Sequence, residues 1–163
     1  MEDYKIEIKT VAHDDAEFLY ILMNDGEILG RLNDVSTTLE DWEDAVKVWG
    51  NDSDEENFLV WLNGDRIGWF SFNNLQSADR IAYLKMAVLL PEYQHRGIGT
   101  AVLRRLLEDL KGRGYEVVML YTNADNVNAQ KCYQKCGFVA VEEFQDVMAD
   151  GSCVERYKMQ CDL

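Results

Sequence analysis

The sequence predicts a single-domain α/β (α+β) protein in which a mixed β-sheet carries helices on both faces. The chain has 163 residues, 47% hydrophobic and 28% charged, which is enough for one well-formed core and short for two. Strand-like and amphipathic helical runs follow one another without repeats or low-complexity linkers. We therefore expect residues 1–163 to form one domain.

The first part of the chain predicts a strand and then two amphipathic helices. The strand is expected near Tyr4–Thr10. Asp14 or Asp15 can cap the first helix, and Thr37-Thr38-Leu39-Glu40 resembles a capping box at the start of the second.

Four strands follow in the next part of the chain. Residues 58–62 and 66–73 are joined by Asn63-Gly64, a dipeptide that favours a tight hairpin. Ile81–Leu90 and Val117–Thr122 are largely apolar, which is typical of central strands covered on both faces.

Two more helices and a final strand pair complete the pattern. One helix begins at Ile98, and another begins after Asn126. The apolar stripe of the first consists of Leu103, Leu106, Leu107 and Leu110. Residues 138–144 and 154–159 predict an antiparallel pair around a turn at Asp150-Gly151.

The segment Pro91–Thr100, with the sequence PEYQHRGIGT, joins a central strand to a helix and predicts an anion site. Gly97 and Gly99 let a ligand approach the backbone, and the turn from Ile98 offers unpaired N–H groups at the positive end of the helix dipole. The spacing fits neither a P-loop nor the dinucleotide-binding fingerprint. We expect a phosphorylated ligand.

Gln94-His95-Arg96-Gly97-Ile98-Gly99, preceded by Val88–Tyr93, resembles the acyl-CoA loop of the GNAT superfamily of N-acyltransferases. A second segment, Tyr121–Phe138, ends in Tyr-x-x-x-Gly-Phe and is similar to the other cofactor segment of that family. The resemblance covers about residues 80–145. It implies a mostly antiparallel sheet with two splayed central parallel strands, and a pantetheine arm lying in the gap between them.

The resemblance implies acetyl-CoA as co-substrate, no metal, and a set of residues that hold the cofactor. The main chain near Val88 and Leu89 would bind pantetheine and stabilise the oxyanion. Asn126 would bridge toward the pantetheine arm or the neighbouring strand, although an Asn early in a helix is also a common cap. Tyr133 is the candidate catalytic acid that protonates the leaving thiolate. The implied cofactor-binding residues are Val88, Leu89, Gln94, His95, Arg96, Gly97, Ile98, Gly99, Thr100, Asn126 and Tyr133.

The general base is left open by these residues. Many members of the family place a glutamate in the strand before the loop, where this chain has the segment 83–87, YLKMA. Glu92, Asp79 or Tyr83 could serve instead, and so could an ordered water. The spacing between Val88 and the proline of the loop also predicts a bulge or a shifted register there.

The implied activity is transfer of an acetyl group to a primary amine, and the alternative is a non-catalytic acyl-CoA-binding or sensing domain. His13–Glu56 carries fourteen Asp and Glu against two basic residues, whereas Pro91–Lys135 carries seven Lys and Arg against five acids. This asymmetry suits a polyanionic cofactor and a cationic acceptor such as a polyamine, an aminoglycoside or a peptide amine, although the acids can equally form a solvated surface. We expect the first two helices to flank the acceptor opening, with Trp42 and Trp49 either lining it or packed in the core.

Other function classes are disfavoured by composition. A net charge of −14 argues against a nucleic-acid binder. No run is long enough for a membrane span and MEDYKIEIKT is no signal peptide, so a cytoplasmic location and a monomer or homodimer are expected. The two histidines favour neither a metal site nor a Ser-His-Asp triad. Buried, reduced thiols are expected at the cysteines 132, 136, 153 and 161.

Overall fold

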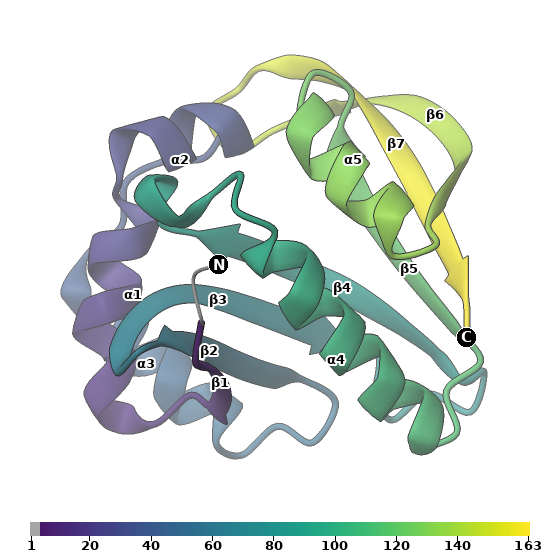
Figure 1. Ribbon diagram of the computed structural model, residues 1–163. Coiled ribbons are helices and arrows are strands. Elements are labelled where there is room, and N and C mark those ends of the chain that lie inside the picture. The colour runs from purple at the N-terminus through teal and green to yellow at the C-terminus, as the bar shows by residue number, and fades with distance from the viewer. Residues whose placement is uncertain (1–3) are drawn as a thin grey trace.

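A seven-stranded mixed sheet forms the centre of the molecule (Figure 1). The computed structural model describes residues 4–163, so the first three residues of the predicted domain lie outside the described residues. The strands are β1 (Ile6–Thr10), β2 (Glu56–Leu62), β3 (Asp65–Asn73), β4 (Ile81–Leu89), β5 (Val117–Asn123), β6 (Val139–Val147) and β7 (Cys153–Asp162). Their order is β1-β2-β3-β4-β5-β7-β6, with β4 and β5 parallel and the other neighbours antiparallel. The predicted mixed sheet is confirmed.

Helices cover both faces of this sheet (Figure 1). The helices are α1 (Ala16–Met23), α2 (Gly26–Leu32), α3 (Leu39–Trp49), α4 (Ile98–Gly112) and α5 (Val127–Lys135), with short 3-10 turns η1 (His13–Asp15) and η2 (Pro91–Tyr93). Residues of α4 and α5 belong to one hydrophobic cluster, and residues of α1, α2 and α3 belong to another. The sheet therefore separates two cores.

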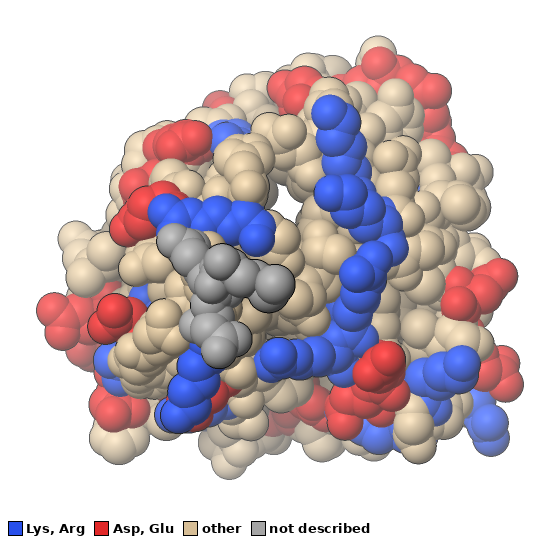
Figure 2. All heavy atoms as spheres, in the orientation of Figure 1, with Lys and Arg blue, Asp and Glu red and all other residues tan. Residues whose placement is uncertain are grey.

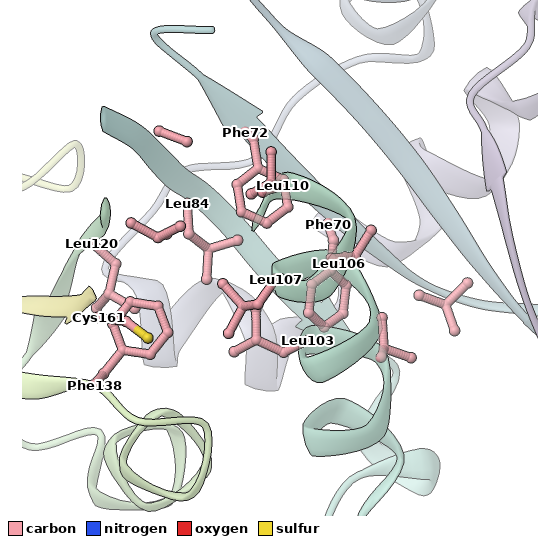
Figure 3. Packing of buried hydrophobic residues seen from close by; sticks show 14 of the residues in the cluster. Phe70, Phe72, Leu84, Leu103, Leu106, Leu107, Leu110, Leu120, Phe138 and Cys161 are labelled. Atoms are coloured by element: carbon pink, nitrogen blue, oxygen red, sulfur yellow. The ribbon is translucent and has the colours of Figure 1, made fainter. Parts of the chain in front are cut away.

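The larger core lies between α4 and the sheet (Figure 3). The predicted stripe is confirmed, since all of its leucines are buried: Leu103, Leu106, Leu107 and Leu110. They pack with side chains from β3, β4 and β5, namely Phe70, Phe72, Leu84 and Leu120. Spacings of three and four residues place such side chains on one face of a helix. This packing holds the start of α4 beside the end of β4.

The smaller core contains a cluster of three tryptophans. The ring of Trp69 lies 5.5 Å from Trp42 and 5.4 Å from Trp49, measured between centroids. Trp42 Nε1 donates a hydrogen bond to Thr37 Oγ1 at 2.8 Å. Of the two expectations for Trp42 and Trp49, packing in the core is the one observed.

The parallel strands β4 and β5 diverge after a short paired stretch (Figure 1). Their pairing extends from Ile81 with Val117 to Leu84 with Leu120, although β4 continues to Leu89. On the other edge of β4 the register with β3 shifts at the position of Lys85. The predicted irregularity therefore lies earlier in β4 than the expected position between Val88 and Pro91. A bulge bends the strand that contains it, which helps β4 to turn away from β5.

The helix α2 was not predicted from the sequence. Gly26 and Gly30 lower its helix propensity, but the side chain of Asp25 accepts hydrogen bonds from the N–H groups of Glu27 and Ile28 and caps it. The capping box of α3 pairs Thr38 with Asp41, one residue later than the expected segment Thr37–Glu40. Tertiary packing and capping outweigh propensity here.

The turns and the last two strands agree better with expectation. Asn63 and Gly64 both have positive φ, 50° and 90°, as the predicted hairpin requires. Gly151 also has positive φ, 85°, in the predicted turn between β6 and β7. Both strands run longer than expected, because β6 reaches Val147 and β7 reaches Asp162.

Among residues 4–163, no helix combines the length and the hydropathy that crossing a bilayer requires. No group of three or more His, Cys, Asp or Glu side chains in the same range is placed to hold a metal ion. The cysteines are free thiols; Cys161 is buried, Cys132 and Cys136 are half-buried, and Cys153 is exposed, against the expectation that all are buried.

Candidate active site

A cavity of about 390 Å³ lies where β4 and β5 diverge, and α4 and α5 form its outer walls. We call it the loop cavity, because the segment Gln94–Thr100 forms its rim. Its floor includes Ala87, Val88 and Leu89 at the end of β4. The cavity thus joins the glycine loop to the gap in the sheet.

The backbone of the loop is shaped to present N–H groups at the start of α4. His95 and Gly97 both have positive φ, 62° and 79°, and Gly97 is the residue that precedes the helix. No side chain of residues 4–163 caps this helix. The first N–H groups of α4 are therefore available to an anion.

The charge of the loop cavity is opposite to that of the whole chain. Arg31, Lys131 and Lys135 line it, and none of its described lining residues is Asp or Glu. The chain as a whole carries −14. Figure 2 shows Lys and Arg side chains along the hollow beside α4 and α5, with most acids of this face at its periphery. This local excess of cations suits a polyanionic ligand.

The loop cavity brings together most of the residues expected to hold the cofactor. Those that line it are Val88, Leu89, Gln94, His95, Gly97, Gly99, Thr100, Asn126 and Tyr133. Ile98 is 1% exposed and packs in the larger core, so its main chain alone can reach a ligand. Arg96 lies over the ring of Tyr93, 5.7 Å from the centroid, and does not line the cavity.

Gln94 connects the loop to α2 through its side chain. Its Nε2 donates to the main-chain oxygen of Leu89 at 2.8 Å, and its Oε1 accepts from Arg31 Nη1 at 2.6 Å. Arg31 also forms an ion pair with Glu27 at 2.9 Å. Gln94 therefore positions the loop and a cation together, which the sequence pattern alone did not indicate.

Of the two roles weighed for Asn126, the cap of the helix is observed, and contact with a pantetheine arm stays a prediction. Its Oδ1 accepts a hydrogen bond from the N–H of Ala129 at 3.4 Å, which makes it the cap of α5. The same residue also lines the loop cavity. A capping Asn at this position thus faces the space where a ligand would lie.

Tyr133 lies on α5 between two cavities. It lines the loop cavity and also a second cavity of about 240 Å³, and its ring packs edge-on against Phe138 at 5.9 Å. Burial raises the pKa of Tyr133 well above its usual value, and negative charge on Cys132 and Cys136 would raise it further. The phenol therefore keeps its proton at neutral pH.

The thiol of Cys132, beside the loop, has a lowered pKa. A hydrogen bond from Cys136 lowers the pKa of Cys132 to about 6, and a second hydrogen bond, from Thr100 Oγ1 at 3.4 Å, acts in the same direction. The nearby charges of Lys135 and Arg104 also favour the thiolate. These effects outweigh burial, so the surroundings of Cys132 favour its thiolate form.

The second cavity, which we call the strand cavity, opens on the other side of the gap between β4 and β5. Its walls include Leu84–Ala87 of β4 and Leu120–Asn123 of β5, together with Asp34, Met148 and Arg156. Tyr133, Ala129 and Asn126 line both cavities, which therefore meet at the start of α5. Helix α2 lines both cavities, whereas neither α1 nor α3 lines either cavity within the described chain. The two helices that were expected to flank the acceptor opening therefore border neither cavity.

The residues considered as a general base lie outside both cavities. Asp79 is at the opposite end of β4, where a hydrogen bond from the N–H of Ile81 lowers its pKa. Glu92 belongs to η2, and Tyr83 stacks on Tyr121 at 6.2 Å. Asp34 is the carboxylate that lines the strand cavity, and its Oδ1 accepts from the N–H of Val35 at 2.8 Å.

Relatives of known name are acetyltransferases. The chain is 28% identical over 138 residues to the mycothiol acetyltransferase of Streptomyces bingchenggensis, which covers 84% of this chain and 44% of the relative. It is 29% identical over 96 residues to an uncharacterized N-acetyltransferase of Methanocaldococcus jannaschii, covering 55% of this chain and 42% of that one. The chain thus spans less than half the length of these relatives.

Solved structures of the same fold cover nearly the whole chain. The spermidine N-acetyltransferase of Vibrio cholerae, in complex with CoA and spermine, superposes with a TM-score of 0.87 at 18% identity over 97% of this chain and 95% of that one. AAC(6')-Ib, in complex with paromomycin and acetyl-CoA, gives a TM-score of 0.79 at 18% identity over 96% and 93%. These likenesses establish the fold.

The family assignment rests on the sequence together with this architecture. Residues 31–138 match the acetyltransferase (GNAT) family. The matched region, residues 31–138, includes the end of β4, the glycine loop and α5, which line the loop cavity, and it also includes β5. The chain therefore belongs to the GNAT family of acetyltransferases.

Proposed function

We propose that this chain is an acetyl-CoA-dependent N-acetyltransferase that transfers an acetyl group to a primary amine. The observation that carries the proposal is the loop cavity. An uncapped helix N-terminus and the cations Arg31, Lys131 and Lys135 lie there, at the mouth of two diverging strands, in a strongly acidic chain. Family membership and the CoA-bound structure of similar fold support the same reading.

The residues of the loop cavity fit a diphosphate joined to an extended amide chain. Main-chain N–H groups between Gln94 and Thr100 would hold the phosphates, together with the nearby cations. Past Leu84 the edge of β4 that faces β5 is no longer paired with that strand. The pantetheine amides would bond to this edge as an added strand does, near Val88 and Leu89.

The reaction requires three things: stabilisation of the negative charge on the thioester oxygen, stabilisation of the departing sulfur, and a group that accepts the proton of the amine. Acetyl-CoA supplies the thioester, whose carbonyl carbon bonds to the amine nitrogen while the carbon–sulfur bond breaks. A main-chain N–H near Val88 would stabilise the charge on the oxygen. Tyr133, whose pKa lies above that of an ordinary thiol, would donate a hydrogen bond to the departing sulfur. The proton of the amine would pass to water in the strand cavity, where Asp34 is the nearby carboxylate.

The acceptor would enter through the strand cavity. A cationic acceptor remains a prediction from the acid-rich segment, and the spermine and paromomycin in the structures of similar fold make a polyamine and an aminoglycoside sensible members of a test panel. The loop cavity and the strand cavity are both built from one chain, so a monomer and a homodimer could each be active. We also propose a cytoplasmic location, which the free thiols support.

Two measurements on the full chain test this function. Titration calorimetry should show that acetyl-CoA binds, and release of free CoA should then be followed with spermidine, paromomycin, amino acids and short peptides as acceptors. Turnover with any of these amines supports the enzyme. Binding without turnover across the panel would favour the acyl-CoA sensor, and absence of binding would overturn both.

A further inference from the structure

Two residues that line the strand cavity each have a buried polar atom without a hydrogen-bond partner among residues 4–163. One of these atoms is a hydrogen-bond acceptor and the other is a donor. Asn123 Oδ1 is an acceptor, and Arg156 Nε carries a donor hydrogen. Asn123 is 6% exposed. Leaving a buried polar atom without a hydrogen bond costs free energy. We therefore expect a ligand or a water molecule to bind to both atoms.

The orientation of the Asn123 amide is fixed by its other contacts. Its Nδ2 donates to Asn33 Oδ1 at 2.8 Å and to the main-chain oxygen of Arg31 at 3.4 Å. A carbonyl oxygen can accept but not donate, so the nitrogen must face Arg31. The oxygen of Asn123 is therefore the atom left free.

Asn123 and Arg156 are neighbours across two strands. They are directly opposite each other in the β5–β7 pair. The Cβ atoms of such a pair are about 4.5–5.5 Å apart, and the side chains lie on the same face. One small ligand can therefore reach both residues, in the cavity that Tyr133 also lines.

The charge of the strand cavity favours an anionic group on this ligand. Its charged lining consists of Arg31, Lys85 and Arg156 against one acid, Asp34. Arg31 is bound to Gln94 and Glu27, and Lys85 to Glu55 at 2.7 Å. Arg156 has a looser ion pair, 3.4 Å to the half-exposed Asp146, and its Nε remains free.

We propose that the acceptor is an amino-carboxylate, with a carboxylate next to its primary amine, as in an α-amino acid. Arg156 would bind the carboxylate, and Asn123 Oδ1 would accept an N–H of the neutral amine and hold its lone pair toward the thioester. Leu32, Met86 and Met148 also line the cavity and suit an apolar side chain. This proposal rests on the proposed function and replaces the polycation by a smaller, zwitterionic acceptor.

Matched acceptors that differ at the carboxylate test it directly. L-phenylalanine, L-phenylalaninamide and 2-phenylethylamine share the ring and the amine, and leucine with leucinamide and isopentylamine forms a second set. At saturating acetyl-CoA, kcat/KM from CoA release should be about 10- to 100-fold higher for the amino acid in at least one set, as expected for one charge-assisted hydrogen bond. Equal turnover within both sets, or a preference for spermidine, overturns the proposal and leaves the acetyltransferase intact.

Variants locate the effect at the proposed residues. Arg156→Gln should lower kcat/KM for the amino acid by the same factor and leave the decarboxylated amine nearly unchanged, while Arg156→Lys should restore part of the difference. Lys158→Gln is the matched control. Lys158 lies on the same strand as Arg156, and both side chains lie near the ring of Tyr121, but Lys158 does not line the strand cavity. Retained discrimination in Arg156→Gln would contradict the assignment.

A binding measurement separates this inference from the proposed function. In the presence of CoA, millimolar L-phenylalanine or L-leucine should raise the Tm of the wild-type protein and of Lys158→Gln, but not of Arg156→Gln. If no amine is acetylated, such a shift still supports the amino-carboxylate site while the enzymatic function fails. If neither amino acid is turned over and neither shifts the Tm, the proposal is wrong.

Discussion

Tyr133 is the residue whose chemistry can be tested most cleanly. Replacing Tyr133 by Phe removes the proton that would bond to the departing sulfur and keeps the ring that packs against Phe138. Turnover should fall about 100-fold while the Kd of acetyl-CoA changes little, because the interaction matters chiefly in the transition state. Single-turnover kinetics and calorimetry measure the two quantities.

The raised pKa of Tyr133 predicts how turnover depends on pH: activity that needs the protonated phenol should be lost only at high pH. A raised pKa keeps the phenol protonated until the pH passes its folded value, which lies above the ordinary value of about 10. Loss of turnover through this phenol should therefore begin only above about pH 10.

The control for Tyr133→Phe is Tyr20→Phe, at an exposed tyrosine of α1. Unchanged turnover in Tyr133→Phe would remove the residue from the mechanism.

Gly99 tests the cofactor assignment of the loop. An added Cβ would lie 3.7 Å from Leu89 Cδ1 and 3.8 Å from Cys132 Sγ, which are ordinary contacts, so the protein itself tolerates a side chain there. The branches of Val would instead occupy space in the loop cavity. Gly99→Val should raise the Kd of acetyl-CoA at least about tenfold, as a loss of 1.4 kcal/mol would.

The control for Gly99 lies on the same helix. Gly112→Val is placed at the far end of α4, where a Cβ meets nothing within 4 Å. Its acetyl-CoA affinity should equal that of the wild type. Equal affinities in both variants would count against phosphate binding at this loop.

At the scale of elements, Gly68 decides how closely β3 approaches the part of β4 that lines the loop cavity. A Cβ at this position would lie 2.5 Å from the main-chain oxygen of Val88 and 2.5 Å from Leu89 Cδ2. Gly68→Ala must therefore push the strands apart, at an expected cost of about 1–3 kcal/mol in the free energy of unfolding. Urea denaturation measures this, and weaker acetyl-CoA binding should accompany it. Gly30→Ala in α2, where the added methyl meets nothing within 4 Å, should be neutral or stabilising.

Elements with a strong apolar period were predictable, whereas helix α2, which is short and depends on its cap, was not. The leucine stripe of α4 and the hairpin at Asn63-Gly64 are encoded by neighbouring residues, so both were predictable from the sequence. Helix α2 contains two glycines and depends on the cap formed by Asp25, so its sequence shows no clear helical signal. Its absence from the prediction explains why Arg31 was missed as a cavity residue, although it lines both cavities.

For the molecule as a whole, the proposed function requires that acetyl-CoA approach an acidic protein and bind in a basic cavity. The chain carries −14, while Arg31, Lys131 and Lys135 line the loop cavity. Contacts within the cavity are screened strongly only when the Debye length, about 8 Å at 0.15 M salt, falls to about 3 Å at 1 M. The Kd of acetyl-CoA should therefore rise several-fold between these concentrations, whereas that of acetyl-pantetheine, which lacks phosphates, should stay flat. Parallel salt curves for the two ligands would contradict phosphate recognition.

The half of the candidate site that is expected to hold the cofactor could be proposed from the sequence, because its residues are close together along the chain. The glycine loop and α5 each form a continuous segment with a recognisable spacing. The strand cavity instead combines Asp34, Asn123 and Arg156, which the sheet topology brings together from distant positions. No local pattern marks such a set, so the acceptor side required the structure.

The early parting of β4 and β5 has a consequence for motion. Beyond Leu84, amide groups of both strands face the interior without the cross-strand partner that a closed sheet would give them. In deuterated water, amides of this inner edge should exchange faster than those of the paired stretch Ile81–Leu84. If the proposed function holds, a pantetheine arm would complete the missing ladder of hydrogen bonds. The free protein would then have an incomplete sheet that the co-substrate completes, and each catalytic cycle would form and break this added pairing.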